Sequence, residues 1–113
     1  MAPRQAYRVT TFVPPESLES VLEAIEREAE PLRFGSYDRW AWWSAPGIEQ
    51  FRPLGGADPT VGKVGEIERV PSVRLEFALP REPEVLERVL ERGLIPTHPW
   101  EEPVVFVDET LIP

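Results

Sequence analysis

The sequence has no cysteine and no asparagine, and it contains one histidine, His98, and one lysine, Lys63. Without cysteine, the chain can form no disulfide, no thiolate nucleophile and no zinc site with sulfur ligands. The lack of cysteine also fits a reducing compartment. His98 is therefore the one imidazole that each chain offers for catalysis or metal binding.

Positive charge is also scarce. Twelve Lys and Arg residues stand against 20 Asp and Glu residues, which gives a formal net charge of −8, and no stretch of the chain forms a basic stripe. Nucleic acids and anionic membrane surfaces both attract proteins through clustered basic side chains. The composition therefore predicts neither a nucleic-acid nor a membrane partner.

Long apolar runs are missing as well. No run approaches the roughly 20 residues that cross a bilayer, and residues 1–4 lead directly into a strand pattern, without the apolar core of a signal peptide. A length of 113 residues suits one domain and is too short for two. We therefore predict one cytoplasmic domain spanning residues 1–113.

The strand and helix signals of the chain occur in the same order in each of its halves. Residues 7–13 are β-branched and aromatic, which predicts a strand, and apolar side chains recur at helical spacing from Leu18 to Ala29. The tryptophan-rich residues 37–44 predict the strand that follows. These three elements make up the first half of the chain.

The second half repeats the order. Residues 73–79 alternate apolar and polar side chains, as a half-buried strand does. A second apolar stripe runs from Val85 to Leu90, with Gly93 placed to cap the helix at its C-terminus. Residues 104–108 predict the last strand. Two strand–helix–strand units side by side form the ferredoxin-like split βαβ sandwich, an α+β fold in which an antiparallel sheet carries both helices on one face.

The other face of this sheet is predicted to carry bulky apolar side chains. Alternation places Phe12 there, together with either Trp42 or Trp43. Large apolar groups on a bare sheet face are typical of a covered surface. We therefore predict that the protein is a homo-oligomer that covers this face with copies of itself.

The connection between the halves, residues 45–70, is long and rich in glycine and proline. Loops of this length are uncommon in a compact domain unless they have a function or short strands of their own. Its apolar residues are compatible with a small hairpin. The stretch from Gly55 to Gly65 is compatible with binding an anion through backbone N–H groups, but it lacks the lysine and hydroxyl residue that end a phosphate loop, so a plain connection is the alternative.

The run His98-Pro99-Trp100-Glu101-Glu102-Pro103 places an imidazole, an indole and two carboxylates within six residues. Imidazole binds zinc, copper or nickel, and carboxylates can complete such a site, so His98, Glu101 and Glu102 are candidate ligands of a divalent metal. A lone histidine needs the symmetry of an oligomer to make a tight site. The alternative is structural, with the prolines fixing a turn and His98 and Glu101 bonding to backbone.

Together these segments resemble the insert domain of the Nif-three-like (YqfO) proteins. The resemblance rests on Gly35-Ser36-Tyr37-Asp38, Pro46-Gly47, the segment 51–59, Gly62 with Gly65, and the segment 98–103, and it covers most of residues 7 to 108. The family's paired-metal ligands lie in a flanking domain that this chain lacks, so its proposed hydrolase activity is not expected here. The insert domain is itself similar to the CutA and PII signalling proteins, and this likeness implies a trimer.

The leading hypothesis is a non-catalytic binding or regulatory module. Its ligand would be a divalent metal or a small metabolite held at a subunit boundary by Tyr37, His98, Trp100, Glu101 and Glu102. One alternative is a small enzyme that uses His98 as general base, because the pKa of imidazole lies near neutrality. Another is a pure protein-interaction module that uses the 45–70 connection.

Overall fold

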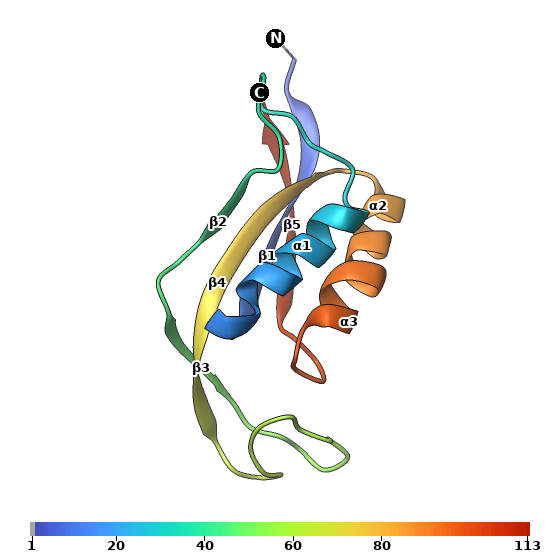
Figure 1. Cartoon of the computed structure of the whole chain (residues 1–113). Coiled ribbons are helices and arrows are strands. Elements are labelled where there is room, and N and C mark those ends of the chain that lie inside the picture. Colours follow the sequence, from blue (N-terminus) through green and yellow to red (C-terminus); the bar gives the residue numbers. More distant parts are fainter. Residues whose placement is uncertain (1) are drawn as a thin grey trace.

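The computed structural model describes residues 2–113 (Figure 1). In chain order its elements are β1 (Arg4–Val13), a short 3-10 turn (Pro15–Ser17), α1 (Leu18–Glu28), β2 (Ala41–Trp43), β3 (Gly47–Phe51), β4 (Glu68–Pro80), α2 (Pro83–Arg88), a π-type helical stretch (Val89–Leu94), α3 (Ile95–Thr97) and β5 (Val105–Ile112). No helix among these residues is long and apolar enough to cross a membrane.

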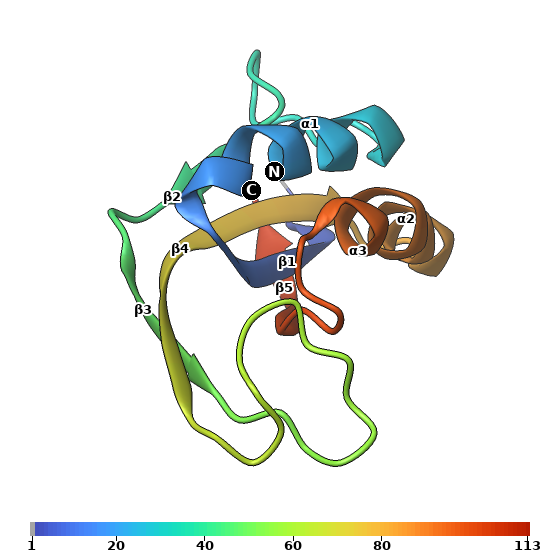
Figure 2. The same ribbon diagram turned by 60° about the horizontal axis from the view of Figure 1, so that its bottom comes forward.

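The sheet is antiparallel and has the strand order β2-β4-β1-β5, with β3 paired to the N-terminal part of β4. Both helical segments cover one face of it (Figures 1 and 2). The predicted split βαβ sandwich is therefore confirmed. The alternating side chains of β1 and β4 meet the helices in one core, where Val9, Leu75, Val21 and Val89 are fully buried.

The strand predicted over residues 37–44 is shorter than expected, since β2 covers three residues. The chain first makes a tight turn, in which Phe34 and Tyr37 exchange two backbone hydrogen bonds of 2.7 and 3.1 Å. Gly35 allows this turn because its φ of 61° lies in the left-handed region. The predicted strand therefore begins only where the chain has returned to the edge of β4.

The 45–70 connection contains more regular structure than expected. β3 pairs with residues 68–72, so β4 begins at Glu68 rather than at Val73. The two strands form an arm that projects beyond the helices (Figure 1). The segment without regular structure is residues 52–67, which we name the 52–67 loop.

Gly93 does not cap a helix. The helical backbone continues past it through Thr97, so the predicted C-cap was wrong. A Cβ atom at Gly93 would lie 2.9 Å from the backbone oxygen of Ala24 in α1. The two helical segments are therefore in close contact at this position, and glycine is needed there for packing.

The face of the sheet that points away from the helices, which we call the open face, carries both aromatic and charged side chains. The register aligns Trp42 of β2, Glu76 of β4 and Phe106 of β5 in one row, so Trp42 is the tryptophan that points away from the helices. The carboxylate of Glu76 forms ion pairs with Arg74 at 3.0 Å and with Arg8 at 3.9 Å. Trp42 is 47% exposed and Phe106 is 58% exposed. In a single chain, part of this apolar surface meets water.

Candidate functional site

His98 lies just after α3 and is buried, with 5% of its surface exposed. Its Nε2 is 2.7 Å from the backbone oxygen of Phe12, and the backbone N–H of Trp100 donates to its Nδ1 at 3.0 Å. A backbone N–H can only donate, so Nδ1 accepts and Nε2 carries the proton that goes to Phe12. His98 is therefore held as one neutral tautomer.

The electrostatics of His98 agree with this geometry. Burial lowers the pKa of His98 below 6.5, and this effect outweighs the Phe12 carbonyl and the Glu49 carboxylate, which both raise it. Both ring nitrogens are used within the chain, and residues 2–113 contain no group of three or more His, Asp or Glu side chains arranged to hold a metal ion. Neither the metal site nor the general-base role of His98 gains support from this arrangement.

Glu101 fastens the 52–67 loop to the 98–103 segment. Its two carboxylate oxygens lie 3.0 and 3.1 Å from the backbone nitrogen of Asp58, which donates to them. The hydroxyl of Thr60 donates to the carbonyl of Pro99 at 2.8 Å. Figure 2 shows the two segments side by side. The loop amide that was a candidate for binding an anion is thus occupied by a carboxylate of the protein itself.

Replacing Glu101 by alanine is expected to loosen this loop. A charge-assisted hydrogen bond contributes about 1.5–3 kcal/mol, less where water competes. We therefore expect the Asp58 amide to exchange with solvent roughly tenfold faster. Hydrogen exchange followed by NMR measures this change. Glu102→Ala removes a neighbouring carboxylate that bonds to no other group in residues 2–113, and it is expected to leave exchange at Asp58 unchanged. Equal exchange in both variants would contradict the role given to Glu101.

A cleft of about 500 Å³ lies between the loop and the 98–103 segment. Its walls are the rings of Phe51 and Trp100, the side chain of Val104 and the loop backbone, and its charged residues are Glu49, Arg52, Glu101 and Glu102. The ring centroids of Phe51 and Trp100 are 6.0 Å apart. Pockets for small organic molecules typically measure about 300–1,000 Å³ and have mostly apolar walls. This cleft has both properties.

A second cleft of about 340 Å³ adjoins the first on the open face of the sheet. Glu49 and Val104 line both clefts, while Phe12 and Arg74 line the second alone. The hydroxyl of Ser72, which is buried, donates to one carboxylate oxygen of Glu49 at 3.0 Å. Glu49 therefore stands on the boundary between the two clefts.

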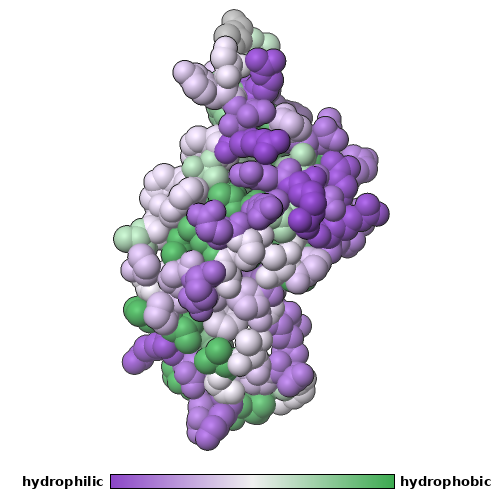
Figure 3. Space-filling model, in the orientation of Figure 1, coloured by the Kyte–Doolittle hydropathy of each residue, from purple (hydrophilic) through white to green (hydrophobic). Residues whose placement is uncertain are grey.

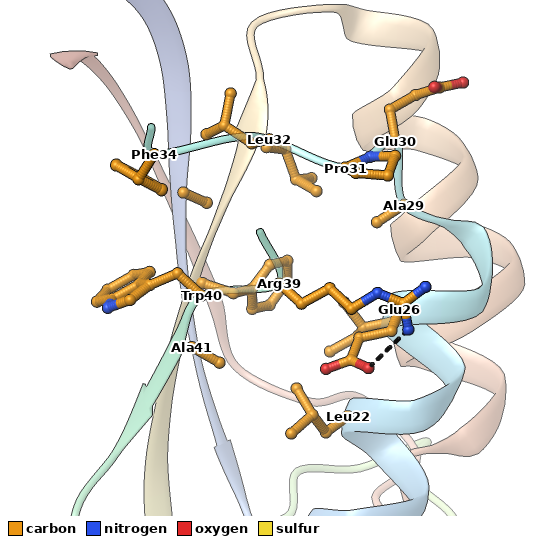
Figure 4. Close-up of a pocket in the computed structure, with 14 residues that line it drawn as sticks. Leu22, Glu26, Ala29, Glu30, Pro31, Leu32, Phe34, Arg39, Trp40 and Ala41 are labelled. Carbon is orange, nitrogen blue, oxygen red and sulfur yellow. Dashed lines mark ion pairs between the residues drawn. The ribbon is translucent and has the colours of Figure 1, made fainter. Parts of the chain in front are cut away.

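Figure 4 shows a smaller hollow between α1 and the segment that leads to β2. Its volume is about 80 Å³, well below that of ordinary ligand pockets. Arg39 reaches across it to Glu26 of α1, with 3.7 Å between the guanidinium and the carboxylate (Figure 4). The hollow is the place where this segment is attached to α1, so it is a weaker candidate than the large cleft.

Of the five predicted ligand-binding residues, Trp100, Glu101 and Glu102 line the cleft, and His98 lies next to them without lining it. The structure places Tyr37 elsewhere, 80% exposed in the turn after Arg33. The carbonyl of Arg33 accepts a hydrogen bond from Arg4 at the start of β1, whereas His98 contacts Phe12 near its end. Eight residues of strand separate these two points by about 26 Å. Tyr37 is therefore not part of the cleft.

The sequence did not identify Glu49, Phe51 and Asp58 as parts of the same site. Glu49 and Phe51 lie on β3, within the connection for which the sequence indicated only that a small hairpin was possible. The signal that was available is the glycine- and proline-rich stretch itself, which marks the loop but not its contact with the 98–103 segment.

The comparisons with known proteins agree with the resemblance. No family model matches the chain. A Bacillus subtilis protein named GTP cyclohydrolase 1 type 2 homolog is 38% identical over 95 residues, which are 84% of this chain and 24% of that protein. A Mycobacterium leprae protein of the same name is 36% identical over 92 residues, which are 81% of this chain and 23% of that protein. The solved structure of a Bacillus cereus protein related to NIF3 matches with a TM-score of 0.74 and 25% identity, over 97% of this chain and 27% of that one.

This chain is a homologue of one segment of the Nif-three-like proteins. The resemblance inferred from the segments 35–38, 51–59 and 98–103 is thereby confirmed. The chain spans about a quarter of the length of the curated relatives that it matches. The activity in their name belongs to much longer proteins and is not carried over to this chain.

Proposed function

We propose that this Nif-three-like chain is a cytoplasmic, non-catalytic binding module whose 500 Å³ cleft holds a small organic molecule. The proposal rests on which side chains of the cleft are already hydrogen-bonded and which remain in its lining. The polar groups of Glu101, and of the neighbouring His98 that does not line the cleft, are bonded to backbone, and the lining left for a ligand consists of rings, loop backbone and the charged side chains of Glu49, Arg52 and Glu102. A ring-bearing molecule that packs against Phe51 and Trp100 fits such walls.

We propose a non-catalytic role because both ring nitrogens of His98 are hydrogen-bonded within the chain. A general base needs a free lone pair within reach of substrate, and the lone pair of Nδ1 accepts from Trp100. A metal ligand needs the same lone pair. A divalent metal bound by His98, Glu101 and Glu102 would therefore require the 98–103 segment to rearrange, and it stays a prediction for a site shared between chains.

We further propose a homo-oligomer, most simply a trimer, that covers the open face of the sheet. The half-exposed rings of Trp42 and Phe106 support this assembly. The second cleft opens on the same face and shares Glu49 and Val104 with the first. A neighbouring subunit on this face would thus border the ligand site, which agrees with a ligand at a subunit boundary.

Protein contact through the 52–67 loop is a second candidate function. Four large apolar side chains of this loop are exposed, namely Leu54, Val61, Val64 and Ile67. On the face seen in Figure 3, separate hydrophobic patches lie along the left side and at the lower end of the molecule, and the right side, where the helices lie, is mostly hydrophilic. An exposed apolar loop fits contact with a partner protein.

A titration with indole tests the main proposal, because indole is a ring small enough for the cleft. We expect NMR shift changes at the backbone amides of Phe51, Ala57 and Thr60 in the intact chain. Trp100→Ala should abolish them, and Trp40→Ala, which removes a tryptophan outside the cleft, should not. Native mass spectrometry of the same sample gives the number of 12.9 kDa copies in the assembly. Scattered or absent shifts in the intact chain would rule out the cleft as a ring-binding site.

A further inference from the structure

We propose that the cleft selects a cationic aromatic molecule, in which a flat ring lies against Phe51 and Trp100 and an ammonium or amidinium group meets Glu49. This inference rests on the proposed function, because it names the ligand class of the same cleft. It follows from the charges around Glu49 and from the position of the two rings.

Glu49 is a half-buried carboxylate that lacks a cationic partner. One of its oxygens accepts a neutral hydrogen bond from the hydroxyl of Ser72, and no ion pair in the described part of the chain involves it. His98 lies close enough for the charge of Glu49 to raise its pKa, yet burial keeps the ring neutral. A partly desolvated charge without a partner is unfavourable, so a cation that reaches it is stabilised.

The nearest arginines in the two clefts do not fill this role. Arg74 lines the second cleft, but its guanidinium is paired with Glu76 at 3.0 Å and lies over the ring of Trp42 at 5.8 Å. Arg52 lines the first cleft and is exposed, so water screens its charge. The side of the cleft formed by Glu49 therefore remains negative.

The rest of the cleft adds to this preference. Its carboxylates, Glu49, Glu101 and Glu102, outnumber its one guanidinium, and the whole chain has a net charge of −8. Phe51 lies two residues after Glu49 on β3, so the two side chains share a face of the strand. An aromatic ring attracts a cation placed over its face. A ligand that joins a ring to a short cationic arm can thus contact the rings and Glu49 together.

Three probes with the same ring and different charge test this inference, namely tryptamine, indole and indole-3-acetate. NMR titrations of the full chain at neutral pH give each dissociation constant from the shifts of the cleft amides. We expect tryptamine to bind about tenfold more tightly than indole, and indole-3-acetate more weakly than indole. Glu49→Gln keeps an oxygen that accepts from Ser72, and it should bring tryptamine to the affinity of indole.

Glu23→Gln is the matched control, because it removes the same charge from the exposed surface of α1 and should leave the preference intact. Equal binding of the three probes in the cleft would overturn the charge selectivity and leave the proposed function standing. A tryptamine preference that persists in Glu49→Gln would overturn the assignment to Glu49. Failure of all three probes to bind in the cleft would overturn both proposals.

Discussion

Replacing His98 by alanine is expected to lower the free energy of unfolding by about 3 kcal/mol. The change leaves two partly buried backbone groups without partners, the carbonyl of Phe12 and the N–H of Trp100, and each such loss costs about 1–3 kcal/mol. It also removes a buried ring that lies next to the ring of Trp100, with 6.0 Å between the ring centroids. Urea denaturation measures the effect. His98→Gln can restore a donor to Phe12, so we expect a smaller loss in that variant.

The pH dependence of the unfolding free energy gives an independent test of the role of His98. The folded chain holds His98 with a pKa below the 6.5 of an ordinary histidine, so between these two values the unfolded chain binds more protons. The contribution of His98 to stability is therefore complete above about pH 7 and is lost as the pH falls through its folded pKa. The difference in unfolding free energy between the natural chain and His98→Ala should shrink from pH 7.5 to pH 5. If this difference in unfolding free energy did not change with pH, His98 would not be a neutral ring with both nitrogens hydrogen-bonded.

The topology was predictable because its signals are local. Alternation in residues 73–79 and helical spacing after Leu18 each mark a buried face, and a buried face fixes which side of an element meets the core. β3 was not predictable in this way. It pairs with residues 68–72, which include Pro71, and only Ser72 among these five is buried, so no apolar alternation marks the ladder. Proline is tolerated there because this end of β4 runs past the end of β1 and has one free edge.

The candidate site could be predicted from the sequence only in part. The 98–103 segment has a distinctive composition, but composition does not say whether a polar group faces a ligand or bonds to backbone. The partner of His98 is Phe12, which is 86 residues away in the sequence, and the partner of Glu101 is Asp58, 43 residues away. Only the folded chain brings these groups together and places Trp100 and Glu49 in the lining of one cleft.

Replacing Gly93 by alanine is expected to lower the free energy of unfolding by about 2 kcal/mol, although alanine is the better helix former by about 1 kcal/mol. The added Cβ would lie 2.9 Å from the oxygen of Ala24, which is backbone of α1 and cannot move aside without shifting the helix. The clash therefore outweighs the gain in helix propensity. Thermal and urea unfolding should both record the loss.

Gly55→Ala provides the matched control for this prediction. A Cβ atom at Gly55 meets nothing within 4 Å, so we expect its unfolding free energy to change by less than about 0.5 kcal/mol. If Gly93→Ala were neutral or stabilising, the helices would not be in contact through this residue. The two helical segments would then lie farther apart on the sheet, and α3, which begins two residues after Gly93, would not hold His98 next to Phe12. The packing of one glycine thus connects the core of the fold to the 98–103 segment, which borders the cleft.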